Sequence, residues 1–240
     1  MDARMTDWSQ LKHAYGTAED IPVLFERLGT EPNDGVWGDL WSRLCHQGSV
    51  YPASFAALAL LADLGDQGGK DGDDALLLAG AIAGAADEET RARHGVLIER
   101  LRILAHARIR RPAEPAFYVC LLQTAMALDG VRVWSSALEG LADGTIEVFC
   151  PECEMGVFVS IGEAGYFSAV GDWEPGDPAG APLRAAAPAD LEGPGRVLYD
   201  AASQAGLDTV ALALTYVFGE GTCGECGAEF PIAEQVAEQY

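Results

Sequence analysis

Four cysteines, arranged as two Cys-x-x-Cys pairs, limit the folds open to this chain. The pairs are Cys150-Pro-Glu-Cys153 and Cys223-Gly-Glu-Cys226. Each pair can bend into a tight turn whose two sulfurs reach one ion, and two such turns supply the four thiolates of a tetrahedral zinc site. Pro151 presets one backbone angle, and Gly224 permits angles that a side chain would disfavour. We therefore predict one structural Zn²⁺ ion, held by Cys150, Cys153, Cys223 and Cys226.

The two pairs resemble the knuckles of the zinc-ribbon or rubredoxin-type family, through a Cys-Pro-x-Cys and a Cys-x-x-Cys-Gly. This resemblance implies a small α+β module in which strands lead into the knuckles. Two departures stand out. Glu154 occupies the position where the first knuckle would usually have glycine, and about seventy residues separate the pairs, against roughly fifteen to twenty in a compact site. The module must therefore contain an insertion.

Three other uses of the four cysteines remain open: a redox-active pair, an iron or iron–sulfur centre, and two disulfides. Structural zinc is favoured because four protein thiolates leave no open coordination position and because redox chemistry would need only one pair. Iron accepts the same ligands. The other two cysteines, Cys45 and Cys120, lie on apolar helical faces and are expected to be buried free thiols.

The formal net charge of the 240-residue chain is −22, and between Thr145 and Tyr240 only Arg184 and Arg196 are cationic. Such a charge repels nucleic acid phosphates and anionic lipid surfaces, so we expect no direct nucleic acid binding and no membrane association. Met1 to Gly16 lacks the apolar run of a secretion signal, and no segment is long and apolar enough to cross a bilayer. These features favour a cytoplasmic protein. The acidic charge is explained first by plain solubility, and a basic protein partner fits it as well.

Before Thr145, apolar residues recur at helical spacing between short turns, and alanine and leucine dominate. Helices are expected over 8–15, 21–28, 37–44, 55–62, 75–86, 88–108, 117–128 and 134–141, with a loop rich in Gly and Asp over 65–74. Each apolar stripe is too narrow to be stable alone and must pack on its neighbours. The fold class is therefore mainly α, either a HEAT-like α-solenoid with about forty residues per repeat or a closed helical bundle.

The sequence changes character at Thr145, where polar and apolar residues begin to alternate as in a half-buried strand. We therefore divide the chain into a helical HEAT-like domain, 1–144, and a zinc-ribbon module with a helical insertion, 145–240. The second part is expected to contain strands over 145–150, 157–161 and 166–170, a long surface loop over 171–195, and helices over 197–202, 210–218 and 231–240.

The stretch VWGDLWSRLCHQGSVYPAS, which begins at Val36, is rich in aromatic residues. Together with Leu11-Lys-His-Ala-Tyr-Gly16 and Asp20-Ile-Pro22, it resembles the start of actinobacterial HEAT-repeat-like proteins over Trp8 to Leu64. That resemblance implies helical architecture and carries no biochemical role. Trp37, Trp41, His46 and Tyr51 are candidate partner-binding residues in an aromatic-lined groove. The favoured alternative is that Trp37, Trp41 and Tyr51 fill the first core between helices, because large aromatic side chains dominate burial.

No convincing catalytic set is found, since the chain lacks Gly-x-Ser-x-Gly, a phosphate-binding glycine loop and His-Glu-x-x-His. The leading hypothesis is a non-enzymatic protein–protein interaction protein stabilised by structural zinc, with an immunity or antitoxin-like role against a basic partner as its concrete form. The alternative is a zinc-dependent or acid–base enzyme with a site between the helical domain and the ribbon. Its acid–base pairs would be His46 with Asp39 or His94 with Glu88.

Overall fold

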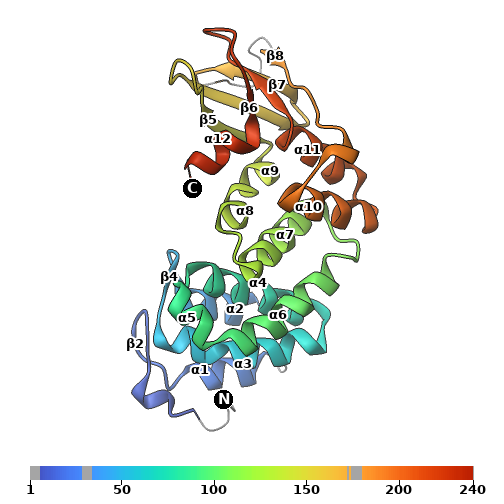
Figure 1. Ribbon diagram of the computed structural model, residues 1–240. Coiled ribbons are helices and arrows are strands. Elements are labelled where there is room, and N and C mark those ends of the chain that lie inside the picture. The colour runs from blue at the N-terminus through green and yellow to red at the C-terminus, as the bar shows by residue number, and fades with distance from the viewer. Residues whose placement is uncertain (1–5, 29–33, 172, 174–179, 240) are drawn as a thin grey trace. The chain divides into compact units, whose positions relative to one another are not determined.

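The computed structural model describes residues 6–28, 34–171, 173 and 180–239 (Figure 1). The chain divides into two compact units. Unit 1 comprises residues 1–108 and 124–130, and unit 2 comprises residues 109–123 and 131–240. Residues 109–123 and 131–144 thus group with the cysteine-containing part of the chain. The division into domains 1–144 and 145–240 stays a prediction.

Unit 1 is helical, with two very short hairpins near its start (Figure 1). The hairpins pair β1 with β2 and β3 with β4, each in antiparallel register. The elements are η2 (Trp8–Gln10), β1 (Lys12–His13), β2 (Gly16–Thr17), α1 (Ile21–Arg27), α2 (Asp34–Leu44), β3 (Cys45–His46), β4 (Ser49–Val50), α3 (Pro52–Gln67), α4 (Gly69–Ala85), α5 (Glu88–Arg93), α6 (Gly95–Arg108) and the last part of α7 (Pro115–Asp129).

The core of unit 1 is built from aliphatic side chains on the inward faces of these helices. Leu40, Leu61, Leu78, Ile82 and Leu101 have no exposed surface. Full burial of one such side chain contributes roughly 1.5–3 kcal/mol. The apolar stripes that contain these residues are therefore packing faces of unit 1.

Three expectations about unit 1 are wrong. The range 8–15 is a short 3-10 turn followed by a hairpin, because the His13 ring accepts the backbone N–H of Tyr15 and turns the chain. The range 65–74 is largely helical, since Gly68, with a φ of 70°, makes the whole connection between α3 and α4. The helix expected over 88–108 is interrupted at His94, which separates α5 from α6.

Unit 2 combines helices with a four-stranded antiparallel sheet of order β5-β6-β7-β8 and a separate β9–β10 hairpin. The elements are the first part of α7, α8 (Arg132–Ala137), α9 (Glu139–Asp143), β5 (Thr145–Phe149), β6 (Gly156–Gly162), β7 (Gly165–Val170), β8 (Ala181–Pro182), η3 (Pro188–Asp190), α10 (Gly193–Gln204), α11 (Asp208–Val217), β9 (Glu220–Thr222), β10 (Glu229–Pro231) and α12 (Ile232–Gln239).

The alternation that begins at Thr145 is confirmed as a half-buried strand. Ile146 and Val148 face the interior while Glu147 and Phe149 are exposed. Val148 pairs with Val157 of β6, and helices α11 and α12 contact β6 and β5. The two later expected strands and the helices α10, α11 and α12 are also present. The expected loop over 171–195 is only partly described: β8, η3 and the start of α10 lie within it, while 172 and 174–179 lie outside the described residues.

The protein is thus mainly α, with small antiparallel sheets. A solenoid arrangement stays a prediction. Within the described part of the chain, every helix falls short of the length and apolar character that crossing a bilayer requires.

Candidate metal centre

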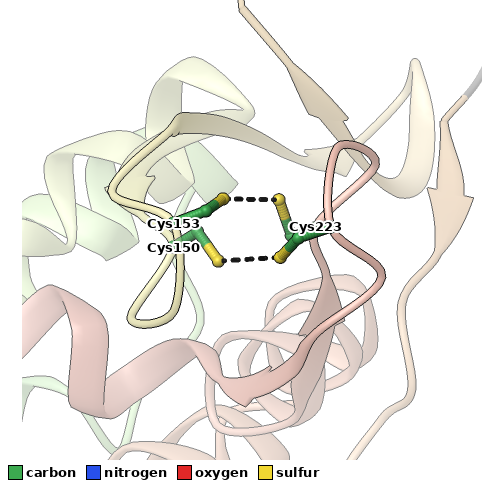
Figure 2. Close-up of side chains that lie close together, drawn as sticks. Cys150, Cys153 and Cys223 are labelled. Atoms are coloured by element: carbon green, nitrogen blue, oxygen red, sulfur yellow. Dashed lines mark hydrogen bonds between the residues drawn. The ribbon is translucent and has the colours of Figure 1, made fainter.

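The four cysteines of the two pairs converge on one point of unit 2 (Figure 2). The Sγ atoms of Cys150 and Cys226 lie 3.7 Å apart, as do those of Cys153 and Cys223, and all four lie within 4.8 Å of one another. In a tetrahedral site with metal–sulfur bonds of about 2.3 Å, neighbouring sulfurs are about 3.8 Å apart. The closest sulfur separations therefore match the edge of such a tetrahedron, and they are far longer than the roughly 2 Å bond of a disulfide.

Each cysteine pair occupies the turn of a hairpin. Cys150 directly follows β5 and Gly156 begins β6, so the first pair lies in the β5–β6 turn. Cys223 directly follows β9, and the second pair lies in the β9–β10 turn. Strand pairing therefore fixes the entry and exit of each turn.

The two turns share one backbone geometry. The N–H of Cys150 donates to Met155 O at 2.8 Å, and the N–H of Glu154 donates to Cys150 O at 2.9 Å. The second turn repeats both bonds at equal lengths, from Cys223 N–H to Ala228 O and from Gly227 N–H to Cys223 O. Because both hydrogen bonds recur, the two turns are knuckles of the same type.

The position that seemed irregular in the sequence is the left-handed residue of the knuckle. Gly227 has a φ of 77°, and Glu154, at the equivalent place, has a φ of 59°. Glycine adopts this conformation freely, whereas another residue pays a steric penalty on the order of 1–2 kcal/mol. Glu154 therefore departs from the knuckle pattern in residue type and follows it in backbone conformation.

Backbone N–H groups of the two turns donate hydrogen bonds to the cysteine sulfurs. Burial raises the pKa of the Cys150 thiol, but the N–H groups of Glu152 and Cys153 donate to its sulfur and bring the pKa down to about 7. The N–H of Met155 lowers the pKa of Cys153, yet burial and the neighbouring sulfurs outweigh it and raise that pKa to about 12. Cys150 therefore ionises more readily than Cys153, and a cation between the sulfurs would favour the thiolate form of both.

Contacts outside the cysteines hold the second hairpin against the sheet. The buried Ser168 of β7 donates its hydroxyl to Thr222 O at 2.7 Å and accepts the Thr222 N–H at 3.2 Å. Arg184 and Glu220 exchange two backbone hydrogen bonds, each of 2.9 Å. These contacts bring the knuckles together although β8, α10 and α11 lie between them in the chain, which is the insertion that the spacing predicted.

The residues present fit a closed, structural metal site. Cys150 and Cys223 are each 1% exposed, Cys153 is half-buried and Cys226 is exposed. Among the described residues, these four cysteines are the only group of three or more histidine, cysteine or acidic side chains placed to share one ion. Four thiolates complete a tetrahedron and leave no position for substrate.

The candidate partner-binding residues lie in different environments in unit 1. Trp37 is 5% exposed, and its indole N–H donates to Asp71 Oδ1 at 3.0 Å. Trp41, His46 and Tyr51 are half-buried. The burial of Trp37 agrees with a role in the core. Partner binding by these four residues stays a prediction.

The acid–base pairs considered from the sequence have other contacts. Asp39 binds the Arg43 guanidinium at 2.8 Å, and the His46 ring lies 3.2 Å from the hydroxyl of Tyr15. The imidazole of His94 stacks on Phe55. The pairing of His46 with Asp39 and of His94 with Glu88 stays a prediction.

Sequence reasoning missed a chain of polar contacts around Asp20. One carboxylate oxygen lies 3.1 Å from His13 Nε2, and the other accepts from Arg43 Nε at 2.8 Å. Arg43 O accepts the backbone N–H of Ala14 at 3.1 Å. The chain of contacts fixes the first hairpin to α2. Spacing alone gives no signal for it, because its members come from three separate elements.

Comparisons with protein-family models, with curated proteins and with solved structures find no match for this chain. The resemblance to HEAT-repeat-like proteins over Trp8 to Leu64 stays a prediction.

Proposed function

We propose that Cys150, Cys153, Cys223 and Cys226 hold one structural Zn²⁺ ion, and that the ion fastens the zinc-ribbon knuckles of unit 2 together. The match between the 3.7 Å sulfur separations and the edge of a tetrahedral site carries this proposal. When bound, the ion supplies the positive charge that four adjacent thiolates require.

Elemental analysis of protein purified without chelators or oxidants tests the metal. One zinc per chain is expected. One iron per chain, with the colour of a ferric tetrathiolate, would show that the same four cysteines bind iron in place of zinc. A metal-free preparation with four titratable thiols that does not take up added Zn²⁺ would contradict the site itself.

Replacement by cobalt gives a second measurement of the same geometry. Tetrahedral tetrathiolate Co²⁺ absorbs strongly in the visible range, whereas octahedral Co²⁺ absorbs weakly. Cys226→Ser is expected to weaken that spectrum because it removes one thiolate. Cys45→Ser is the matched control, since Cys45 lies outside the cluster.

We further propose that the protein acts without catalysis, as a binding partner of a basic protein. The observation that carries this part is the charge of −22 on a chain whose clustered cysteines form a closed site. A field of this size accelerates encounter with a positively charged partner. An immunity or antitoxin-like role against a basic toxin, such as a nuclease, is the concrete form, and HEAT-like stacking of the helices in unit 1 would present the binding surface.

Capture experiments test the partner. The tagged protein is incubated with lysate of its native cells at low and high salt, next to an unrelated protein of similar charge as the control bait. A basic protein retained by this chain alone, released by salt and then bound again in purified form, supports the proposal. Retention of the same proteins by both baits would show that binding depends on charge alone. That result would contradict the proposal of a specific partner.

The enzyme alternative makes a different prediction about the metal. A catalytic ion needs a position open to water or substrate. Zinc bound at less than one per chain, or a cobalt spectrum that changes when small anions are added, would favour that alternative over the structural role.

A further inference from the structure

Unit 1 contains a cavity of about 550 Å³ that neither the metal nor the charge of the chain explains. Three stretches far apart in the sequence line it: residues 6–11, 50–56 and 90–94. Cavities of roughly 300–1,000 Å³ that combine apolar walls with a few polar groups are typical of small-molecule sites. The cavity lies outside the cysteine cluster, so an inference about it is independent of the metal.

One wall of the cavity is apolar and aromatic. Leu11, Tyr51 and Phe55 contribute to it, and the Phe55 ring stacks on the imidazole of His94 with centroids 5.4 Å apart and planes 21° apart. Planar rings of this kind favour offset stacking with a further ring. A ligand with an aromatic ring therefore fits this wall.

His94 brings a polar group to the same wall. Burial lowers the pKa of its imidazole, and the nearby charge of Arg93 lowers it further, so the ring is neutral at physiological pH. No residue in the described part of the chain is found in a hydrogen bond with its ring nitrogens. A neutral imidazole has one donor and one acceptor to offer.

Two opposite charges complete the lining. Asp7 accepts from the N–H and the hydroxyl of Ser9 through a single oxygen, Oδ1, at 3.2 and 2.6 Å. Arg93 donates from one nitrogen to Glu89 at 2.7 Å. The other N–H groups of its guanidinium do not take part in that hydrogen bond and can donate to a ligand. With one acid, one base and a neutral His94, the lining has a formal charge of zero in a chain of −22. The cavity is therefore a local exception to the acidic composition.

We propose that this cavity binds a small zwitterionic molecule with an aromatic ring, of the chemical class of the aromatic amino acids. The ring lies against Tyr51 and Phe55, the ammonium group faces Asp7 and the carboxylate faces Arg93. A purely anionic ligand is repelled by Asp7 and by the overall negative charge of the chain. A purely cationic ligand is repelled by Arg93. A zwitterion satisfies both side chains.

Four probes of one ring system test this assignment by calorimetry and ligand-observed NMR: L-tryptophan, tryptamine, indole-3-propionate and indole. L-tryptophan is expected to bind most tightly. Each probe that lacks one charge is expected to bind about two- to fivefold more weakly, because water screens an exposed ion pair and keeps its contribution small.

Variants separate the charges from the ring. Asp7→Asn and Arg93→Ala are expected to weaken L-tryptophan about two- to fivefold and to leave indole unchanged. The matched controls are Ser9→Ala, which removes the hydroxyl donor to Asp7 and keeps the backbone N–H donor, and Glu89→Gln, which removes the charge beside Arg93. Neither residue lines the cavity, and both variants are expected to keep the affinity or raise it. Phe55→Leu keeps an apolar wall and is expected to weaken all four probes about three- to tenfold.

Failure of all four probes to bind at millimolar concentration, with a normal thermal melt, would overturn the site. Equal binding of the four probes, unchanged by Asp7→Asn and Arg93→Ala, would overturn the zwitterionic class. Neither outcome bears on the zinc content of unit 2, so the two proposals fail separately.

Discussion

Both units bury apolar side chains, but only unit 2 also brings together four sulfur atoms that repel one another when ionised. The core leucines of unit 1 attract one another without help, because burial removes their surface from water. The four cysteines of unit 2 share so little space that their joint ionisation depends on a cation. Two parts of one chain therefore differ in what their folding requires, and only the second is expected to respond to metal.

Removal of the metal is expected to have the largest effect on this difference between the units. A structural zinc site contributes on the order of 10 kcal/mol to the folding of its own module. We expect a chelator to increase amide hydrogen exchange in β5, β6, β9 and β10 by several orders of magnitude and to leave helices α3 and α4 protected. Hydrogen exchange followed by mass spectrometry measures both in one sample.

Cysteine variants provide the control for that experiment. Cys223→Ser is expected to reproduce the effect of the chelator, because it removes a buried ligand of the cluster. Cys120→Ser, which lies outside the cluster, is expected to keep full protection of the strands. Loss of protection in α3 and α4 on chelation would show that the two units do not differ as proposed.

A truncation in the core of unit 1 tests the opposite side of the comparison. Leu78 is fully buried, and Leu78→Ala is expected to lower the free energy of unfolding by about 2–5 kcal/mol, from lost burial and the cavity left behind. Denaturant unfolding with a helical signal measures it. The loss should be the same with and without chelator. Val96→Ala, at an 87% exposed position, is the control and should change stability by less than about 0.5 kcal/mol.

The two knuckles of unit 2 differ at their left-handed position, which is Gly227 in one and Glu154 in the other. Substitutions there test how backbone strain affects zinc binding. Gly227→Ala is expected to cost about 1 kcal/mol, which is about fivefold in zinc affinity, because alanine is strained at a φ of 77°. Glu154→Gly is expected to strengthen zinc binding by a smaller factor, since glycine relieves the strain but increases the freedom of the unfolded chain. Competition with a chromophoric chelator measures both.

A neighbouring substitution separates backbone strain from charge. Glu152→Gly removes a carboxylate from the same turn without touching a left-handed position. It is therefore expected to give no gain in zinc affinity. An equal gain from Glu152→Gly and Glu154→Gly would mean that repulsion between carboxylate and thiolate, rather than backbone strain, sets the effect.

The sequence predicted the cysteine cluster well because its signal is local. Two residues between paired cysteines define a knuckle, and alternation from Thr145 defines the strand that leads into it. That both knuckles would meet followed from chemistry, since each supplies half of a tetrahedron. The same locality explains the helix expected over 55–62, where Leu58, Leu61 and Ala62 are buried on one face of α3.

The errors arose where a side-chain hydrogen bond or helix packing overrides the preference that residue spacing and composition indicate. The range 8–15 has helical spacing, yet the His13 ring takes a backbone N–H that a helix would need. The opposite error occurred at 65–74, where Gly and Asp suggested a loop. There the packing of α3 against α4 requires a helix, and the acidic Asp71 suits the first turn of α4. The contacts of Asp20 likewise join elements that no spacing connects.

The smallest expected effect concerns that Asp20 cluster, which is the polar counterpart in unit 1 of the sulfur cluster in unit 2. Burial raises the pKa of Asp20, but hydrogen bonds from Arg43 and His13 and their charges outweigh burial and lower it below 3.8. A carboxyl group whose pKa is lower in the folded state stabilises the fold above its unfolded pKa, and this stabilisation is lost as the pH falls through the folded pKa.

Asp20→Asn is therefore expected to reduce the stability of unit 1 at neutral pH by less than about 1 kcal/mol, because the carboxylate is 45% exposed and water screens its pairs. The difference from the parent protein should shrink as the pH falls below 3.8. Denaturant unfolding of both proteins at neutral pH and at pH values on either side of 3.8 measures it. A difference that stays constant across this range would assign the effect to packing.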